Sequence, residues 1–133
     1  MTIYGTGIDY PVMHSSVDTD YYLFRDPTGK PSIIGSIFMD TNCSPDFSDY
    51  KSILYGHHMD SHVMLGDLDL FDKQDFFNEH LYGNLFYNDK NHGLKIFSYI
   101  KTTSKDSVIY NFGINSEIAK IQHLSKIHDR SLY

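Results

Sequence analysis

Two apolar runs in the first half of the chain have the pattern of buried strands. Residues 32–40 are almost entirely apolar and include one glycine, and residues 52–55 form a shorter run that leads directly into Gly56 and His57. Short apolar runs with β-branched residues, bounded by turn residues, are typical of strands covered on both faces. A third run, residues 8–13, contains Pro11, which cannot donate to a strand ladder. We therefore expect two buried strands and one strand at a sheet edge.

The apolar spacing becomes helical after residue 60, where Asp60 or Ser61 is suited to cap a first turn. The residues that recur near the 3.6-residue period are Val63, Met64, Leu68 and Phe71. This pattern predicts a short helix after His57, and residues 72–80 predict a further helical turn or two. Because Phe71, Phe76 and Phe77 have helical spacing, we interpret them as part of the core rather than as a binding face.

The second half of the chain predicts a hairpin followed by a strand. Apolar residues 84–87 and 94–101 flank residues 88–93, which are rich in turn formers. Residues 107–112 are rich in β-branched and aromatic residues, and they predict a further strand.

The last periodic segment predicts the longest helix, which is amphipathic and can be capped by Asn115 or Ser116. Its apolar residues are Ile114, Ile118, Ile121, Leu124 and Ile127. The chain has no internal repeat, low-complexity tract or linker, and 133 residues suffice for one core but not for two. We therefore expect residues 1–133 to form a single domain.

Composition narrows the class of protein. The chain holds 11 tyrosines and nine phenylalanines, a bias that favours a β-rich fold. Its net charge of −6 comes with no run of lysine or arginine, so we expect no nucleic-acid partner. No stretch approaches the ~20 apolar residues of a membrane-spanning helix, and no charged-then-apolar leader opens the chain. As it stands, the chain is therefore expected to lack an anchor or signal and to be soluble.

The strongest candidate for chemistry is His57, which follows the second predicted buried strand and Gly56. Histidines give and take protons near neutral pH, so the end of a strand is a favourable place for a catalytic acid or base. From the spacing alone, solvated loop histidines at His57 and His58 are the commoner outcome.

Eight histidines raise the alternative of a metal site. His58 and His62 are four residues apart and could meet on one face of a helix. Two ligands are too few, no third ligand has a suitable spacing, and no His-Glu-x-x-His motif is present. We therefore expect neither a bound metal nor a cofactor.

Three separated stretches together resemble the class B sortases, a family of surface cysteine transpeptidases. Residues 5–12 (Gly-Thr-Gly-Ile-Asp-Tyr-Pro-Val) resemble the family's opening strand, and residues 21–26 through 35–40 resemble its next block. Residues 55–59 (Tyr-Gly-His-His-Met) resemble the stretch that holds its catalytic histidine, and residues 95–99 and 131–133 also fit. The joint order and spacing make the resemblance specific, and it covers nearly the whole chain.

The resemblance implies a fold and a reaction. The fold would be a mainly β, sortase-like β-barrel that lacks its final strands, with short helices and one longer C-terminal helix. In the family a cysteine attacks the threonine carbonyl of a C-terminal sorting signal, and a peptidoglycan cross-bridge or pilin amine resolves the thioacyl intermediate. His57 would be the catalytic histidine, and an arginine would hold the substrate or the oxyanion. The site of action would be the extracellular face of a bacterial membrane.

The chain departs from the family pattern at the nucleophile and the arginine, because no threonine-cysteine strand and no later arginine follow Tyr133. Cys43 comes before His57, whereas the family's nucleophile comes well after the histidine, so we interpret Cys43 as an incidental loop cysteine. Arg25 and Arg130 do not match the family's arginine and are interpreted as solvated surface charges.

We therefore expect the chain as it stands to be inactive and to expose an unpaired strand edge beside residues 52–55, which would favour self-association. The alternative is a non-catalytic sortase-like remnant, or a module that binds sorting-signal peptides without cleaving them.

Overall fold

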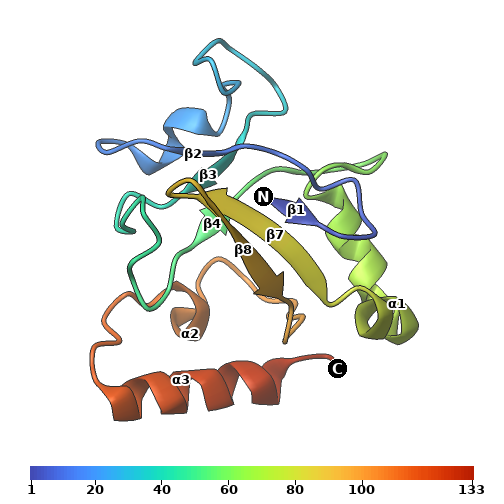
Figure 1. Cartoon of the computed structure of the whole chain (residues 1–133), viewed down its shortest axis with the longest axis vertical. Helices are drawn as coiled ribbons and strands as arrows, with labels where there is room; N and C mark the ends of the chain where they lie inside the picture. The colour runs from blue at the N-terminus through green and yellow to red at the C-terminus, as the bar shows by residue number, and fades with distance from the viewer.

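The computed structural model describes all residues, 1–133, as three small sheets with short helices and one long helix (Figure 1). The strand order in the first sheet is β1 (Thr2–Ile3), β7 (Tyr82–Tyr87) and β8 (Lys90–Lys95). The strand order in the second sheet is β2 (Val12–His14), β3 (Ile37–Met39) and β4 (Leu54–Tyr55). The third sheet is the hairpin of β5 (His58–Met59) and β6 (Val63–Met64). The helices are η1 (Thr19–Tyr22), η2 (Gly66–Asp72), α1 (Gln74–Glu79), α2 (Ser107–Tyr110) and α3 (Glu117–Arg130), where η marks 3-10 helices.

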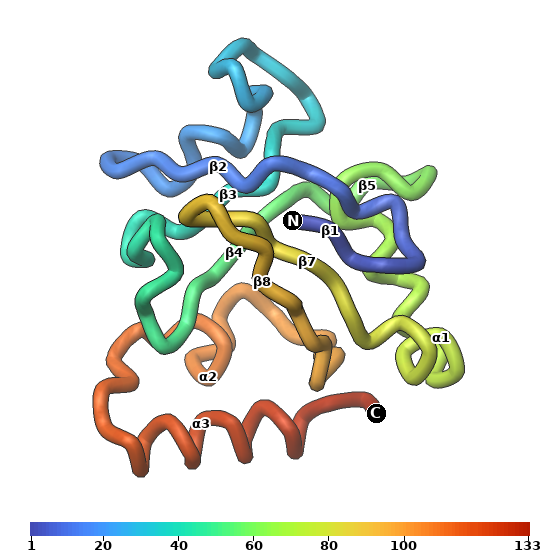
Figure 2. Tube along the Cα trace, viewed as in Figure 1, coloured from blue at the N-terminus to red at the C-terminus, as the bar shows by residue number.

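The arrangement matches the expected layout of short strands, short helices and one longer helix near the C-terminus. The strands form three sheets rather than one closed barrel. In Figure 1 the hairpin of β7 and β8 lies in the middle of the molecule, with α2 and α3 below it and α1 at one side. The segment between β2 and β3 rises at the end of the molecule opposite α3 (Figure 2). None of the helices combines the length and apolarity needed to cross a bilayer.

Strand β3 is the buried centre of the second sheet, as its apolar sequence predicts. It pairs in parallel with β2 and antiparallel with β4, and residues 36–40 are all buried. The strand is shorter than the expected span of 32–40, because Gly35 adopts a positive φ of 61° and Ile33 lies 84% exposed. β2 lies at the edge of this sheet, which agrees with Pro11 just before it, although the strand covers only the end of the run 8–13.

The main hydrophobic core is a cluster of buried residues from the N-terminal segment, η2 and α1. It contains Ile3, Ile8, Phe71 and Phe77, and Phe76 packs against it from the side. The Phe71 and Phe76 rings meet edge to face with centroids 5.1 Å apart, a favourable geometry for aromatic rings. The interpretation of Phe71, Phe76 and Phe77 as core residues is confirmed.

The prediction of a helix directly after residue 60 is wrong, because this segment forms the hairpin of β5 and β6. Ser61, His62 and Met64 adopt positive φ values of 63°, 64° and 54°, which a helix does not allow. The helical spacing from Leu68 to Phe71 belongs to η2, which begins only at Gly66. The second expected helix is confirmed as α1.

The hairpin of β7 and β8 is confirmed, but its turn is two residues long rather than six. Asn88 and Asp89 adopt positive φ values of 49° and 58°, which short polar side chains tolerate and which a two-residue hairpin turn requires. Residues 90–93, expected in the turn, instead pair with β7 in β8.

The prediction of a strand at residues 107–112 is also wrong, because residues 107–110 form the one-turn helix α2. The Asp106 carboxylate caps its first turn by accepting a hydrogen bond from the Val108 amide at 3.0 Å. Arg130 and Thr102 donate to the same carboxylate. Arg130 is an exposed surface charge, as expected, but it also has an ion-pair partner in Asp106. Contacts from distant residues thus override the β-propensity of this segment.

Helix α3 begins as its sequence predicts but packs less than expected. The Ser116 hydroxyl accepts a hydrogen bond from the Ala119 amide at 3.1 Å and caps the first turn. No residue of the helix is buried, and Ile118 and Ile121 remain 70% and 66% exposed. The amphipathic pattern identified the helix correctly, but this apolar face is not covered in the structure.

Asp67 ties the N-terminal loop to η2. Its buried carboxylate accepts a hydrogen bond from the Gly7 amide at 2.5 Å and another from the His62 ring. The Gly7 hydrogen bond, opposed by burial and supported by His62, lowers the pKa of Asp67 below its ordinary value. The ionised form of Asp67 is therefore the form that holds the two segments together.

Asp67→Asn is expected to lower the free energy of unfolding at neutral pH by about 1–3 kcal/mol, because the Gly7 and His62 donors lose their charged acceptor. Since the folded pKa is lowered, the stabilisation is present above the ordinary carboxyl pKa and is lost as pH falls through the folded value. Urea unfolding between neutral pH and about pH 3 measures both effects. The control Asp69→Asn removes the exposed partner of His58 and should cost less than about 1 kcal/mol. Equal losses in the two variants would contradict this role of Asp67.

Candidate functional site

His57 leaves the end of β4 and is held by a backbone carbonyl from the segment before β3. Its Nε2 lies 2.7 Å from the Leu23 carbonyl oxygen, and its ring packs against Phe24 at a centroid distance of 5.1 Å. A carbonyl oxygen only accepts hydrogen bonds, so Nε2 carries a proton and donates. In the neutral ring, Nδ1 is then the nitrogen that is left to take up a proton.

Two glycines allow the close packing around His57. At Gly35 a Cβ atom would overlap the Leu23 carbonyl, the group that accepts the hydrogen bond from His57. At Gly56 a Cβ atom would overlap the Ile37 side chain of β3. The sequence suggested that Gly56 permits a sharp turn, but the structure gives a different reason, which is the close approach of β4 to β3.

A groove of about 640 Å³ runs beside the end of β4. Gly56 lines it, and His57 is the next residue along the chain. Its apolar walls are formed by Leu23, Phe38, Leu54, Tyr55, Leu65 and Tyr110. These residues come from five separate segments of the sequence, and the fold brings them together around the backbone that carries His57.

One wall of the groove is fixed by the buried Asp40. The Tyr55 hydroxyl donates to its carboxylate at 2.8 Å, and the Asn42 amide donates at 2.9 Å. Burial raises the pKa of Asp40, but these hydrogen bonds outweigh it, and the pKa lies below its ordinary value. Burial and the bond to Asp40 together raise the pKa of Tyr55, which therefore stays protonated as the donor.

The part of the groove lining that α2 supplies depends on Lys51. The Lys51 ammonium donates to the carbonyls of Ile109, at 2.8 Å, and Asn111, at the end of α2, and α2 carries Tyr110 into the groove. Burial lowers the pKa of this lysine. The His123 ring adds a hydrogen bond to the Val108 carbonyl at 2.9 Å. Sequence reasoning missed Lys51, because a single lysine in a polar loop has no distinguishing pattern.

The remaining candidates from the sequence have structural roles. Cys43 is 3% exposed, its sulfur accepts a hydrogen bond from the Ile53 amide at 3.3 Å, and burial raises its pKa. It lies in the loop between β3 and β4, as expected, but it is packed there rather than exposed, and its thiol is unsuited to attack. Arg25 donates to the Tyr21 carbonyl at 2.7 Å and lies over the Tyr21 ring, so it is not a fully solvated charge.

The two histidines considered as metal ligands are separated by the fold. His58 lies in β5 and pairs with Asp69 at 2.9 Å, whereas His62 lies in the β5–β6 turn and pairs with Asp67. They do not share a helical face, because the helix expected there does not form. The structure shows no group of three or more histidine, cysteine, aspartate or glutamate side chains that could hold a metal ion.

Comparison with known proteins identifies the family. No family model matches the chain. The chain is 35% identical over 104 residues to Sortase B of Listeria monocytogenes, an alignment that covers 78% of this chain and 42% of the relative. The solved structure of sortase B from Listeria monocytogenes matches with a TM-score of 0.90 and 31% identity, over 99% of this chain and 74% of that one. The chain belongs to the class B sortases.

The length of this class B sortase chain differs from that of its relatives. A second relative, Sortase B of Staphylococcus aureus, is 35% identical over 108 residues, which is 79% of this chain and 43% of the relative. A Staphylococcus aureus sortase B–substrate complex matches with a TM-score of 0.89 and 28% identity, over 98% of this chain and 60% of that one. The chain thus spans less than half the length of the curated relatives it matches.

In this class B sortase chain, Lys51→Met is expected to lower the free energy of unfolding by about 1–3 kcal/mol, because two carbonyls at the end of α2 lose a charged donor. Hydrogen exchange of the α2 amides should accelerate more than exchange in β7. The matched control is Lys105→Met, an exposed lysine that makes no hydrogen bond, which should stay within about 0.5 kcal/mol of the parent. Unchanged exchange in α2 would show that Lys51 does not hold this wall.

Proposed function

We propose that this chain supplies the peptide-binding groove and the proton-transferring histidine of a sortase-type transpeptidase. The observation that carries the proposal is that His57 directly follows Gly56, which lines the groove at the end of β4, and that its Nε2 donates to the Leu23 carbonyl. Nδ1 is then the ring nitrogen that is available for proton transfer. The membership of the class B sortases supports it. So does the existence of a substrate complex of a Staphylococcus aureus relative.

The groove is suited to an extended peptide with apolar side chains. Its walls are mainly apolar, while Thr19, Asp20 and Ser104 supply polar groups to its lining. Burial of apolar peptide side chains would drive binding, and the few polar groups would fix the orientation. We propose that a C-terminal sorting signal binds here with its threonine carbonyl close to His57.

In the proposed reaction a cysteine thiolate attacks the threonine carbonyl, and the peptide bond breaks as His57 gives a proton to the leaving amine. An amine from a peptidoglycan cross-bridge or a pilin then attacks the thioester, gives a proton to His57 and releases the cysteine. The chain provides the histidine but no suitable thiol, because Cys43 is buried with a raised pKa. We infer that these 133 residues, assayed alone, bind the peptide without cleaving it.

The remaining proposals follow the family. We propose that residues 1–133 act as one domain and that the enzyme works on the extracellular face of a bacterial membrane. We also propose self-association of this chain through the edge of β4, which pairs with β3 on one side only in the structure.

The proposal predicts how activity depends on His57. We expect no turnover of a fluorogenic sorting-signal peptide with a glycine amine by the 133-residue chain, because loss of the nucleophile from the catalytic triad of a serine protease costs about a millionfold. A version extended by strands that bear the family's cysteine and arginine should be active. His57→Ala in that version should lower kcat/KM by about 10²–10⁴-fold.

Two results would contradict the proposal. The first is full activity of the extended protein with His57→Ala, which would exclude His57 from proton transfer. The second is turnover by the 133-residue chain that disappears in Cys43→Ala, which would make Cys43 a nucleophile in spite of its burial. Circular dichroism of each variant checks that the fold is retained.

A further inference from the structure

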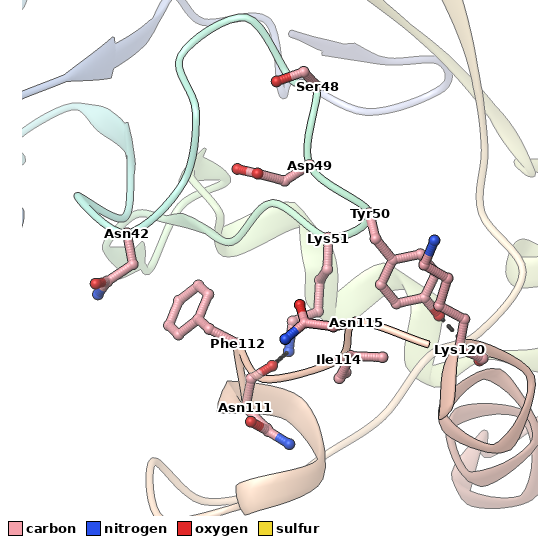
Figure 3. Close-up of a pocket in the computed structure, with 10 residues that line it drawn as sticks. All are labelled: Asn42, Ser48, Asp49, Tyr50, Lys51, Asn111, Phe112, Ile114, Asn115 and Lys120. Atoms are coloured by element: carbon pink, nitrogen blue, oxygen red, sulfur yellow. Dashed lines mark hydrogen bonds between the residues drawn. The ribbon is translucent and has the colours of Figure 1, made fainter. Parts of the chain in front are cut away.

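A second pocket, of about 300 Å³, is lined mainly by polar residues (Figure 3). It is formed by the loop that leads into β4, by residues 111–115 and by the start of α3. No residue lines both this pocket and the groove. Figure 3 shows the Phe112 and Tyr50 rings on opposite sides of the Lys51 side chain.

The charged groups of the pocket already have hydrogen-bond or ion-pair partners within the protein. Lys51 donates to the carbonyls of Ile109 and Asn111. Lys120 pairs with Glu117 at 2.7 Å, and the Asp49 carboxylate accepts a hydrogen bond from the Ser44 amide at 2.5 Å. An ionic ligand would have to compete with these internal partners, so the pocket favours a neutral ligand.

The groups that remain free are neutral amides. The Asn115 side chain makes no hydrogen bond in the structure. Asn111 uses only its oxygen, which accepts from the Gly113 amide at 2.8 Å, and Asn42 uses only its nitrogen, which donates to Asp40 at 2.9 Å. A side-chain amide offers a donor and an acceptor side by side. That pairing matches two neighbouring hydroxyl groups of one ligand.

Two aromatic rings complete the lining. Phe112 and Tyr50 are 38% and 37% exposed, so each keeps an accessible apolar surface. Each ring has a lysine ammonium over it at 5.5 Å from the centroid, Lys51 over Phe112 and Lys120 over Tyr50. A flat apolar surface beside amide groups suits a ligand with a C–H face and a rim of hydroxyls.

We propose that this pocket binds a neutral saccharide, with one sugar ring against Phe112 and its hydroxyls bonded to Asn115 and its neighbours. The volume lies at the lower end of the range for small-molecule sites, which suits one ring. An extended peptide is the weaker candidate, because no strand edge lines the pocket to give a peptide its backbone hydrogen bonds. The proposal does not depend on the reaction proposed at His57.

The test is an NMR titration of the 133-residue chain with cellotriose, maltotriose and tri-N-acetylchitotriose in separate experiments, and with an N-acetylated alanine tripeptide amide. At least one saccharide should give saturable amide shifts that centre on residues 48–51 and 111–115. Asn115→Ala and Phe112→Ala should each weaken its affinity about fivefold, as expected for loss of one neutral hydrogen bond or a similar contact. Asn115 is exposed and unbonded, so its variant keeps the test valid if Phe112→Ala does not fold.

Matched controls are Asn78→Ala, an exposed asparagine on α1, and His57→Ala, and both should bind the saccharide with unchanged affinity. Three outcomes overturn the proposal. They are the absence of shifts at these residues with all three saccharides, an unchanged affinity in both pocket variants, and tighter binding of the tripeptide than of every saccharide at the same residues.

Discussion

The buried carboxylate of Asp40 is the contact on which the geometry of the site depends. It follows β3 directly, is 6% exposed, and accepts hydrogen bonds from Tyr55 of β4 and from the Asn42 amide. A buried carboxylate is costly unless its oxygens are bonded, so the surrounding segments are held to it in one arrangement. β4 continues into His57, and the loop after Asn42 continues into Lys51, which holds α2. Asp40 therefore positions two of the segments on which the groove depends.

The part of the groove formed by α2, a four-residue helix, depends on contacts with other segments for its stability. A single helical turn does not persist in water by itself, since too few hydrogen bonds offset the ordering of its backbone. Here the Asp106 carboxylate caps the start of α2, while Lys51 and His123 donate hydrogen bonds to backbone carbonyls within α2 and just after it. Elements held by few contacts open at the lowest free energy, so we expect α2 to exchange its amide hydrogens faster than the strands that line the groove.

The sequence correctly predicted the elements whose conformation depends on interactions between residues close together in the chain. The apolar run of β3, the serine cap of α3 and the turn-forming residues between β7 and β8 each act within a few residues, and each gave the correct element. The family resemblance added His57 as a candidate that spacing alone did not favour. Its position at the end of β4 followed from the apolar run before Gly56.

The wrong predictions concern segments whose conformation is set by distant residues. α2 has the composition of a strand, but its helix is stabilised by Lys51, His123 and Arg130, which are far away in the sequence. The segment after residue 60 has helical spacing, but residues 58–64 form a hairpin with positive φ values, and its histidines His58 and His62 pair with Asp69 and Asp67. Asp40 and Lys51 were missed because a single polar residue does not reveal in sequence which partner it will meet.

Mapping a bound sorting-signal peptide onto this chain by NMR tests most directly whether the peptide binds beside His57, as we propose. We expect saturable shifts and intermolecular contacts at Leu23, at residues 54–57 and at Tyr110, with the peptide threonine close to the His57 ring. Contacts confined to the pocket of Phe112 and Asn115, or no saturable binding at all, would contradict it.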